Sequence, residues 1–321
     1  MFNFKQYTTE DESHWDDFVP TGNNGTLFHL RHFLNYHPED RFKDHSLLIE
    51  KKGKLFSVFP AAEWEMNGER VLVSHPGSTV GSFVVRENLS IADAMGITEA
   101  LVSYAKENHF SGIRITLPPT LYQRRLSNYL DFAFFKQGFS YAKRDVSSIL
   151  FLENSLEKNL DKFRPSHKRA VINAQEKGVI IQQTNDFESF YGILEQNLNI
   201  RHGVTPTHTL DELLNIQNRF PERINLFGAF VDDKMVAGVV NFIVNEQVVL
   251  AFYISHDEAF QDYRAVNLLF YSIFDWAIQT KFKIYDFGIF TVNGEPNMGL
   301  GRFKENFGAS GIFRDTIELK L

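Results

Sequence analysis

The stretch LFGAFVDDKMVAGVVNFIVNEQVVLAFYISH, residues 226–256, decides the fold of this chain. Short runs of β-branched and aromatic residues, separated by two polar turns, predict three strands within it. The stretch SLLIEKKGKLFSVFPAAEWEMNGERVLVSH, residues 46–75, has the same pattern of strands and turns, and both stretches end in Ser-His. One sheet-forming segment is therefore repeated at a long interval along the chain.

The segments that follow the two stretches also match each other. After each comes a loop, then an amphipathic helix and a strand: residues 91–110 and 113–117 in the first half, residues 267–280 and 283–290 in the second. The second helix is predicted from the apolar residues that share one face at helical spacing, which are Leu268, Leu269, Ile273, Trp276 and Ala277. The matching order predicts an α+β fold of two similar units, each a mainly antiparallel sheet flanked by helices.

Residues 146–154, VSSILFLEN, read as a strand that opens the second unit. We therefore expect a first domain of residues 1–147 and a second of residues 148–321. A helix is expected over residues 164–178, because Pro165 is tolerated in a first helical turn and Gly178 suits a C-terminal cap. Two more helices are expected over residues 187–203 and 207–220.

The composition is that of a soluble globular protein, with 43% hydrophobic and 23% charged residues among 321. The absence of cysteine excludes disulfides, thiolate metal sites and a cysteine nucleophile. The net charge of −7 argues against a general DNA-binding surface. The N-terminus has neither a basic start nor an apolar run, and no segment has the roughly 20 apolar residues that span a bilayer. We expect a cytoplasmic protein without an integral membrane segment.

Three stretches resemble a known family. They are GTLFHLRHFLNYH (25–37), DKFRPSHKRAVINAQEKGVII (161–181), and YDFGIF (285–290) followed by GLGRFKENFG (299–308). Together they are similar to the FemAB-like branch of the GNAT acyltransferases, which resembles two fused GNAT units. The likeness covers nearly the whole chain, and its third stretch is the most specific.

The resemblance implies an N-acyltransferase. It would move an acyl or aminoacyl group from an anionic donor, acyl-CoA or aminoacyl-tRNA, to an amine of a cell-envelope or polysaccharide precursor. The acceptor would be a small or lipid-linked molecule. No tightly bound cofactor is expected, and transfer would be direct because no cysteine is available. The alternative is a non-catalytic relative that recognises a nucleotide-sugar or a lipid-linked glycan.

The donor-binding loop departs from the usual pattern of the fold. Acyl-CoA enzymes of this fold carry an Arg/Gln-x-x-Gly-x-Gly/Ala loop, whose main-chain N–H groups and following helix N-terminus hold the pyrophosphate. The corresponding loop of the second unit, HDEAFQDYRAVN (256–267), contains no glycine. That of the first unit, HPGSTVGSF (75–83), has glycines at other spacings. The acidic net charge also argues against a large tRNA footprint, which leaves the tRNA acceptor end as a partner.

Glycine is concentrated near the C-terminus. Six of the 24 residues from Gly288 to Gly311 are glycine, against 20 of 321 overall, which marks a loop that turns sharply or approaches a ligand. Within it we expect a short helix in which two phenylalanines four residues apart anchor the turn. Arg302 and Lys304 stand beside them and are candidates for holding the donor. By resemblance, Lys304 matches a lysine that neutralises phosphate charge near the reacting ester.

Two further candidate binding sites carry charges or hydroxyl groups. Arg164, Lys168 and Arg169 gather in the first turn of the helix expected over residues 164–178, where a helix favours anions rather than cations. Basic residues there indicate a phosphate site. Ser78 and Thr79 of the HPGSTVGSF loop are candidates for a phosphate or sugar contact.

The general base is not decided by the sequence. Tyr253, Asp286 and His256 lie at the ends of expected strands, where an amine could lose its proton; Tyr253 and Asp286 are carried forward with Lys304 as the catalytic candidates. Each has the competing interpretation of a buried, hydrogen-bonded core residue. The histidines at 29, 32 and 37 lack carboxylates at matching spacing, so no metal site is expected.

Overall fold

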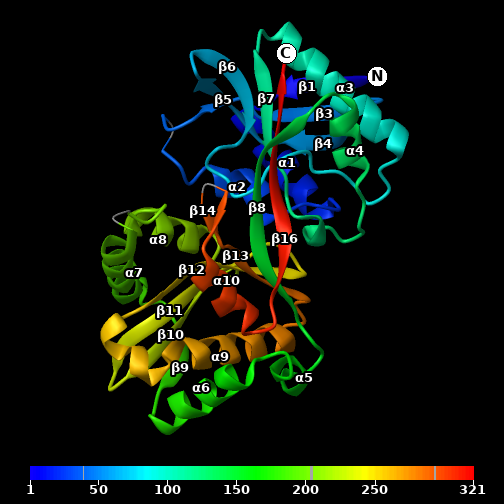
Figure 1. The fold of residues 1–321 in the computed structure, drawn as a ribbon. Coiled ribbons are helices and arrows are strands. Elements are labelled where there is room, and N and C mark those ends of the chain that lie inside the picture. Colours follow the sequence, from blue (N-terminus) through cyan, green and yellow to red (C-terminus); the bar gives the residue numbers. More distant parts are fainter. Residues whose placement is uncertain (39, 203–204, 293) are drawn as a thin grey trace. The chain divides into compact units, whose positions relative to one another are not determined.

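The computed structural model describes residues 1–38, 40–202, 205–292 and 294–321. The chain divides into unit 1, Met1–Asp145 together with Phe313–Leu321, and unit 2, Val146–Ile312 (Figure 1). The assignment of residues 313–321 to the second domain was therefore wrong. The last strand of the chain is part of unit 1.

Unit 1 contains two sheets. β1 (Phe2–Gln6), β3 (Leu47–Lys51) and β4 (Lys54–Phe59) form one of them in the order β1-β3-β4. The other has the order β2-β5-β6-β7-β16 and is made of β2 (Lys43–Asp44), β5 (Ala61–Met66), β6 (Glu69–Ser74), β7 (Gly112–Thr116) and β16 (Ser310–Lys320).

The 46–75 stretch forms four strands rather than the three expected. Pro60 separates β4 from β5, and these two strands belong to different sheets. Proline has no main-chain N–H for a sheet ladder, so the run of strand-forming residues is divided at this position. The two polar turns on either side of β4–β5 fall where the sequence predicted them, at Lys52–Gly53 and Asn67–Gly68.

The helices of unit 1 are short except for α3. α3 (Ile91–Glu107) is capped by the Ser90 hydroxyl and covers the second sheet of the unit. Residues 25–37, the first of the stretches that carry the resemblance, contain the 3-10 turn η3 (Leu27–His29) and a single α-helical turn, α2 (Arg31–Leu34). The remaining helical segments are η1 (Thr9–Asp11), α1 (Glu12–Phe18), η2 (Val19–Thr21), η4 (Thr120–Tyr122) and α4 (Tyr129–Lys136).

Unit 2 is built around one sheet with the order β8-β13-β12-β11-β10-β9. The three strands expected in residues 226–256 are present. The strands are β8 (Ser140–Phe151, within unit 2 from Val146), β9 (Ile180–Thr184), β10 (Ile224–Val231), β11 (Lys234–Ile243), β12 (Val248–His256) and β13 (Ile284–Ile289). A small hairpin pairs β14 (Thr291–Val292) with β15 (Glu295–Pro296).

The predicted helices of unit 2 are all found. α6 has Pro165 at its first position, and Gly178 follows its end with a φ of +75°. The last residue of the predicted helix 187–203, Gly203, lies outside the described residues. The helical segments are α5 (Leu156–Leu160), α6 (Pro165–Glu176), α7 (Phe187–His202), α8 (Leu210–Arg219), η5 (Glu258–Tyr263), α9 (Ala265–Gln279) and α10 (Met298–Glu305).

The two units share one arrangement of elements. In unit 1, β6 runs parallel to β7 and α3 connects them; in unit 2, β12 runs parallel to β13 and α9 connects them. Each parallel pair extends an antiparallel pair, β5–β6 or β11–β12. The predicted α+β fold of two similar units is confirmed.

β12 and β13 pair over a short distance and then separate. Their parallel ladder joins Val248–Leu250 to Ile284–Asp286, although β12 continues to His256. Just beyond the ladder, Phe252 is bulged out of register against β11, and Gly288 takes a φ of +74° that favours glycine. Bulges often re-aim side chains beside functional sites. The end of the β12–β13 pair is therefore a natural place for one.

Candidate functional site

A pocket of about 610 Å³ lies in unit 2 between α6 and the start of α9. α6 supplies one wall, and the end of η5 with the first turn of α9 supplies the other. The lining residues are Ser166, His167, Arg169, Ala170, Asn173, Lys177, Asp262, Arg264 and Asn267. Three of them are cationic and one is anionic, so the pocket favours an anion.

Two lining residues present buried nitrogen atoms that lack partners. Asn267 is 8% exposed, and its Nδ2 has no hydrogen-bond partner among the described residues. The same is true of Nε2 of His167, whose ring packs edge-on against Phe307 with centroids 4.7 Å apart. A buried amide or imidazole nitrogen without a partner costs about 1–3 kcal/mol. A ligand that accepts hydrogen bonds here would remove that cost.

The start of α9 adds to the anion preference. Arg264 stands at its N-cap in a left-handed conformation with a φ of +55°. The first-turn N–H groups of a helix lack intrahelical acceptors, and the helix dipole places positive potential there. The Lys177 ammonium is also fixed at this wall, where it donates to the main-chain oxygen of Asp262 over 2.6 Å.

The surroundings of His167 favour the neutral form of its imidazole ring when the pocket holds no anion. Burial lowers the pKa of His167, and the neighbouring charges of Arg164 and Arg264 lower it further. An anion in the pocket would oppose all three effects because it would stabilise the imidazolium form.

The three basic residues predicted to form a phosphate site at the start of α6 have different surroundings in the structure. Arg169 lines the pocket. Arg164 is the exposed N-cap of α6, and its main-chain N–H donates to Asn306 O. Lys168 forms an ion pair with Asp161, with Nζ 3.3 Å from Oδ1.

A second group of polar residues holds the end of β13. Asp286 is fully buried, and its Oδ1 accepts hydrogen bonds from Ser147 Oγ at 2.6 Å and from Gly288 N at 2.7 Å. Lys304, on α10, is 2% exposed and its Nζ donates to Gly288 O at 2.8 Å and Ile289 O at 2.9 Å. The structure thus brings two of the predicted catalytic residues together around Gly288. Arg302 lies on the same helix and is exposed.

The third predicted catalytic residue, Tyr253, belongs to a separate contact. Its hydroxyl oxygen lies 2.8 Å from Nδ1 of His208 and accepts from the His208 main-chain N–H at 3.1 Å. Burial raises the pKa of Tyr253 to about 12, so the phenol is neutral near pH 7. Tyr253 and Ser255 project from the sheet face that carries α7, opposite to α9.

The candidate loop of unit 1 is held by its own polar contacts. Ser78 Oγ lies 3.0 Å from Phe28 O and 2.7 Å from Val80 O, so the hydroxyl helps to shape the turn. Thr79 is half-buried beside it. Binding of a substrate by either residue stays a prediction.

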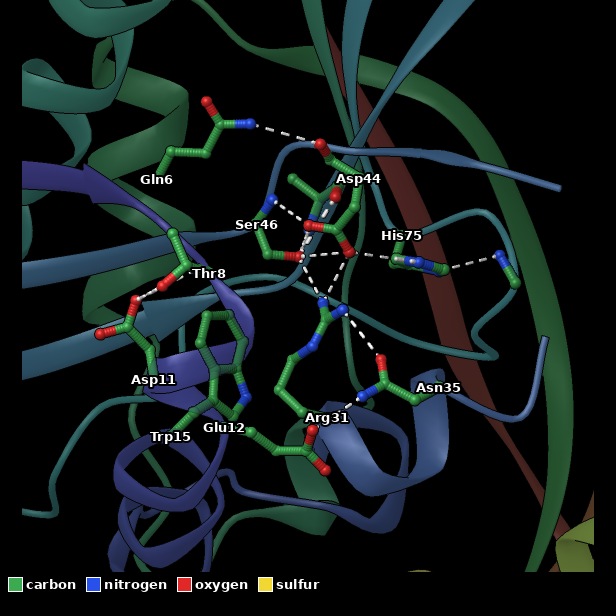
Figure 2. A network of polar contacts seen from close by, with 12 residues as sticks. Gln6, Thr8, Asp11, Glu12, Trp15, Arg31, Asn35, Asp44, Ser46 and His75 are labelled. Atoms are coloured by element: carbon green, nitrogen blue, oxygen red, sulfur yellow. Dashed lines mark hydrogen bonds and ion pairs between the residues drawn. The ribbon is translucent and has the colours of Figure 1, made fainter. Parts of the chain in front are cut away.

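A buried arginine network anchors the strand ends next to this loop (Figure 2). Nη1 of Arg31 donates to Asp44 Oδ2 at 2.7 Å and to Ser46 Oγ at 2.9 Å, and Nη2 donates to Asn35 Oδ1 at 3.0 Å. His75, which begins the loop, lies with Nε2 3.9 Å from the same Asp44 oxygen. We interpret this as a structural network, because both terminal nitrogens of Arg31 are engaged by side chains of the same unit.

A family model described as an acetyltransferase (GNAT) domain matches residues 161–305. This range contains α6, the pocket, the β12–β13 pair and Lys304. Residues 161–305 are therefore similar to a GNAT acetyltransferase domain.

Solved structures share the fold of the whole chain. A crystal structure of FemX is 14% identical and has a TM-score of 0.75, covering 99% of this chain and 97% of that one. A tandem GNAT protein from the clavulanic acid biosynthesis pathway is 12% identical with a TM-score of 0.54, over 100% and 98%. The C-terminal domain of a putative lysylphosphatidylglycerol synthetase from Agrobacterium fabrum is 10% identical with a TM-score of 0.60, over 96% and 91%.

These identities show the fold alone, and they confirm the FemAB-like tandem GNAT fold predicted from the sequence. A search of curated protein sequences found no match. In the described part of the chain, no cluster of three or more His, Asp or Glu side chains could hold a metal ion. None of the helices described there is long and apolar enough to cross a membrane.

The sequence patterns did not indicate the two residues whose buried nitrogen atoms lack partners in the pocket between α6 and α9. His167 lies within the stretch that predicted the phosphate site, but that prediction was based on the charged residues beside it. Asn267 is a polar residue on the buried side of α9, next to Leu268 and Leu269. A polar side chain at a core position of an amphipathic helix is the signal that would have found it.

Proposed function

We propose that the chain is an N-acyltransferase whose GNAT domain binds a phosphate-bearing acyl donor, acyl-CoA or the acceptor end of an aminoacyl-tRNA, in the pocket between α6 and α9. The acceptor is an amine of a small or lipid-linked envelope or polysaccharide precursor. The observation that carries the proposal is the pair of buried nitrogen atoms, Asn267 Nδ2 and His167 Nε2, in a pocket rich in cations.

The pocket supports a phosphate ligand in particular. Arg169 of α6 and Arg264 at the start of α9 both line the pocket, and arginine suits the bidentate recognition of phosphate oxygens. The first turn of α9 adds main-chain donors. The single carboxylate, Asp262, leaves a net positive charge among the lining residues.

This arrangement offers a physical substitute for the missing glycine-rich loop. In the usual acyl-CoA enzyme of the fold, glycines allow the main chain itself to surround the pyrophosphate. Here residues 256–267 have no glycine, and side chains from α6 and α9 supply the donors instead. Side-chain donors reach farther than main-chain N–H groups, so the pocket accommodates a phosphate without a close main-chain approach.

The chemistry requires an amine to attack the donor carbonyl and lose a proton. The bond from the amine nitrogen to the acyl carbon forms as the bond to the donor's sulfur or oxygen breaks, and the amine proton passes to solvent or to a nearby base. Tyr253 lies on the sheet face opposite to the pocket, so the acyl end of the donor would have to pass the end of the β12–β13 ladder to reach it. Its phenol, neutral near pH 7, could there donate to the leaving group or to the developing oxyanion. Asp286 and Lys304 fix the main chain at Gly288, which sets the geometry beyond the β12–β13 ladder.

The test compares donor binding and turnover in matched variants. Asn267→Leu removes the buried donor at nearly constant volume, and Arg169→Ala removes a cation. Calorimetry with acetyl-CoA and with an aminoacylated RNA minihelix should show about tenfold weaker binding of the true donor for each variant. Arg219→Ala, at a half-buried arginine of α8 that does not line the pocket, is the control and should bind like the parent.

The outcomes separate the two functional classes. Product formation with a panel of amine acceptors, reduced in both variants at a limiting donor concentration, supports the transferase. Donor-independent binding of a nucleotide-sugar or lipid-linked glycan, without turnover, would instead identify a non-catalytic binding protein. Unchanged donor affinity in Asn267→Leu would overturn the assignment of the pocket.

A further inference from the structure

Unit 1 exposes a group of large apolar side chains that its core does not use. We call it the aromatic face, and its members are Leu126, Tyr129, Phe132, Phe135, Tyr141 and Phe313. Phe135 is 71% exposed and Phe132 is 51% exposed. Among the described residues, seven aromatic side chains rank as exposed large hydrophobic groups, and five of them belong to this face. Such clustering on a soluble protein marks an interaction surface.

The face comes from α4 and two strands. α4 buries Ala133 and Phe134 in the unit 1 core and directs its other aromatic residues outward. β8 contributes Tyr141 and β16 contributes Phe313, and the Arg144 guanidinium lies 4.0 Å from the centroid of each of these two rings. Phe134 of α4 and Ile317 of β16 belong to the same buried cluster, which places the helix beside this strand.

The charge of the face is opposite to that of the whole chain. Residues 124–144 contain five basic side chains and one acidic one. Arg144 forms a bidentate pair with Asp315, at 2.8 and 2.9 Å, and Lys143 pairs with Asp145 at 2.7 Å. When these two carboxylates are counted with Asp131, five basic and three acidic groups leave +2, whereas the chain carries −7.

From this combination we propose that the aromatic face is a peripheral docking surface for an anionic lipid bilayer. Exposed aromatic and leucine side chains insert at the level of the headgroups, while arginine and lysine residues around them contact lipid phosphates. Arg124, Arg125 and Lys136, all exposed on the same segment, supply cations beyond those engaged by Asp145 and Asp315.

A lipid surface fits the face better than a second copy of the chain. In a two-fold dimer the same face would meet itself and bring two positive patches together, which costs free energy. An anionic bilayer has the complementary charge and needs no shaped partner. Docking of this kind is independent of donor binding, because the face belongs to unit 1 and the pocket belongs to unit 2.

Vesicle sedimentation with the full chain tests the proposal. The parent protein should bind vesicles of phosphatidylcholine mixed with phosphatidylglycerol, bind phosphatidylcholine vesicles much less, and release as salt rises. Phe132→Ser combined with Phe135→Ser should weaken partitioning at least about tenfold. Arg125→Glu combined with Lys136→Glu should abolish the preference for the anionic lipid.

Controls keep the result interpretable. Phe151→Ser removes an aromatic side chain of similar exposure in unit 2 and should leave vesicle binding unchanged. Each variant should keep the parent's melting temperature, because the replaced side chains are exposed. Failure of the parent to bind anionic vesicles would overturn the proposal. So would a parent dimer in light scattering that the two phenylalanine substitutions dissociate, since that result assigns the face to a second copy.

Discussion

At the scale of single residues, buried ionisable side chains tie the stability of the fold to pH. His29 is fully buried, with Nδ1 2.7 Å from Thr26 Oγ1 and Nε2 2.9 Å from Gly81 O. Burial lowers its pKa to about 4, against 6.5 in the unfolded chain. Between these two values the unfolded state binds a proton that the folded state does not, so stability falls as the pH drops from about 6.5 to about 4.

The first prediction concerns this histidine. The shift corresponds to about 3 kcal/mol of unfolding free energy lost by pH 4. His29→Gln should therefore flatten the dependence of the unfolding free energy on pH between 4.5 and 6.5, measured by urea denaturation. A residual slope is expected from His75, whose pKa burial lowers to about 3. His14→Gln, at an exposed position of α1, is the control, and an equal slope in the His29 variant and the parent would contradict the prediction.

The second prediction concerns Lys304. Its ammonium is the hydrogen-bond donor to two main-chain oxygens at the end of β13, so Lys304→Met leaves both without that donor. We expect the unfolding free energy to fall by about 2–4 kcal/mol. Arg302→Met, exposed on the same helix, should change it by less than about 0.5 kcal/mol.

The same variant separates positioning from contact with the donor. Turnover of Lys304→Met should be measured at a temperature where the variant is folded by circular dichroism. A loss of kcat with an unchanged affinity for the donor would agree with a lysine that fixes the main chain at Gly288. Stability equal to that of the parent would show that the two carbonyl contacts contribute little.

The candidate site was predictable from the sequence only where a residue type was unusual for its position. Arg169 was found because a cation is unexpected in a first helical turn. Asn267 was missed because the apolar spacing of α9 reads as continuous with the asparagine included. The amide of Asn267 lines a pocket together with residues of α6, which lies about 100 residues earlier in the chain. A local sequence pattern cannot indicate that these two segments come together.

At the scale of elements, two helix termini show that local backbone conformation and tertiary packing contribute separately to stability. α6 and α10 both end before a glycine with positive φ, Gly178 at +75° and Gly308 at +89°. A Cβ at Gly178 would meet nothing within 4 Å, whereas one at Gly308 would lie 2.5 Å from Lys162 Cβ. The conformations are alike, and the surroundings differ.

The third prediction uses this matched pair. Gly178→Ala should cost only the left-handed strain of an L-residue, about 1 kcal/mol. Gly308→Ala should cost about 3 kcal/mol, because overpacking against Lys162 adds to that strain. Urea midpoints of the two variants measure the difference. Equal costs would mean that the chain around Lys162 moves away without loss.

The elements themselves were largely predictable, since helical and strand periodicities are local properties. The exceptions have tertiary causes. Residues 55–66 read as one strand, but Pro60 divides them between two sheets. The strand β16 was not predicted, because GASGIFRDTIELK contains glycines and charges at its start and pairs with β7 far away in the sequence.

At the scale of the whole molecule, the last strand of the chain returns to unit 1. β16 pairs antiparallel with β7 from Thr116↔Thr316 to Gly112↔Lys320. Its Ile317 is buried in the unit 1 core, in the same cluster as Ile113 and Ile115. Unit 1 therefore cannot complete its sheet until the final residues of the chain are available.

The fourth prediction follows from this connection. A fragment of residues 1–145 should melt on the order of 10 °C below the same fragment joined to residues 313–321 by a flexible linker, because the strand adds a ladder and a buried isoleucine. The joined fragment with Ile317→Asp should lose most of that gain, since it keeps the linker and the chain length but buries a charge. Thermal denaturation followed by circular dichroism gives the melting temperatures of the three fragments. Equal melting temperatures for the first two would show that unit 1 folds without β16.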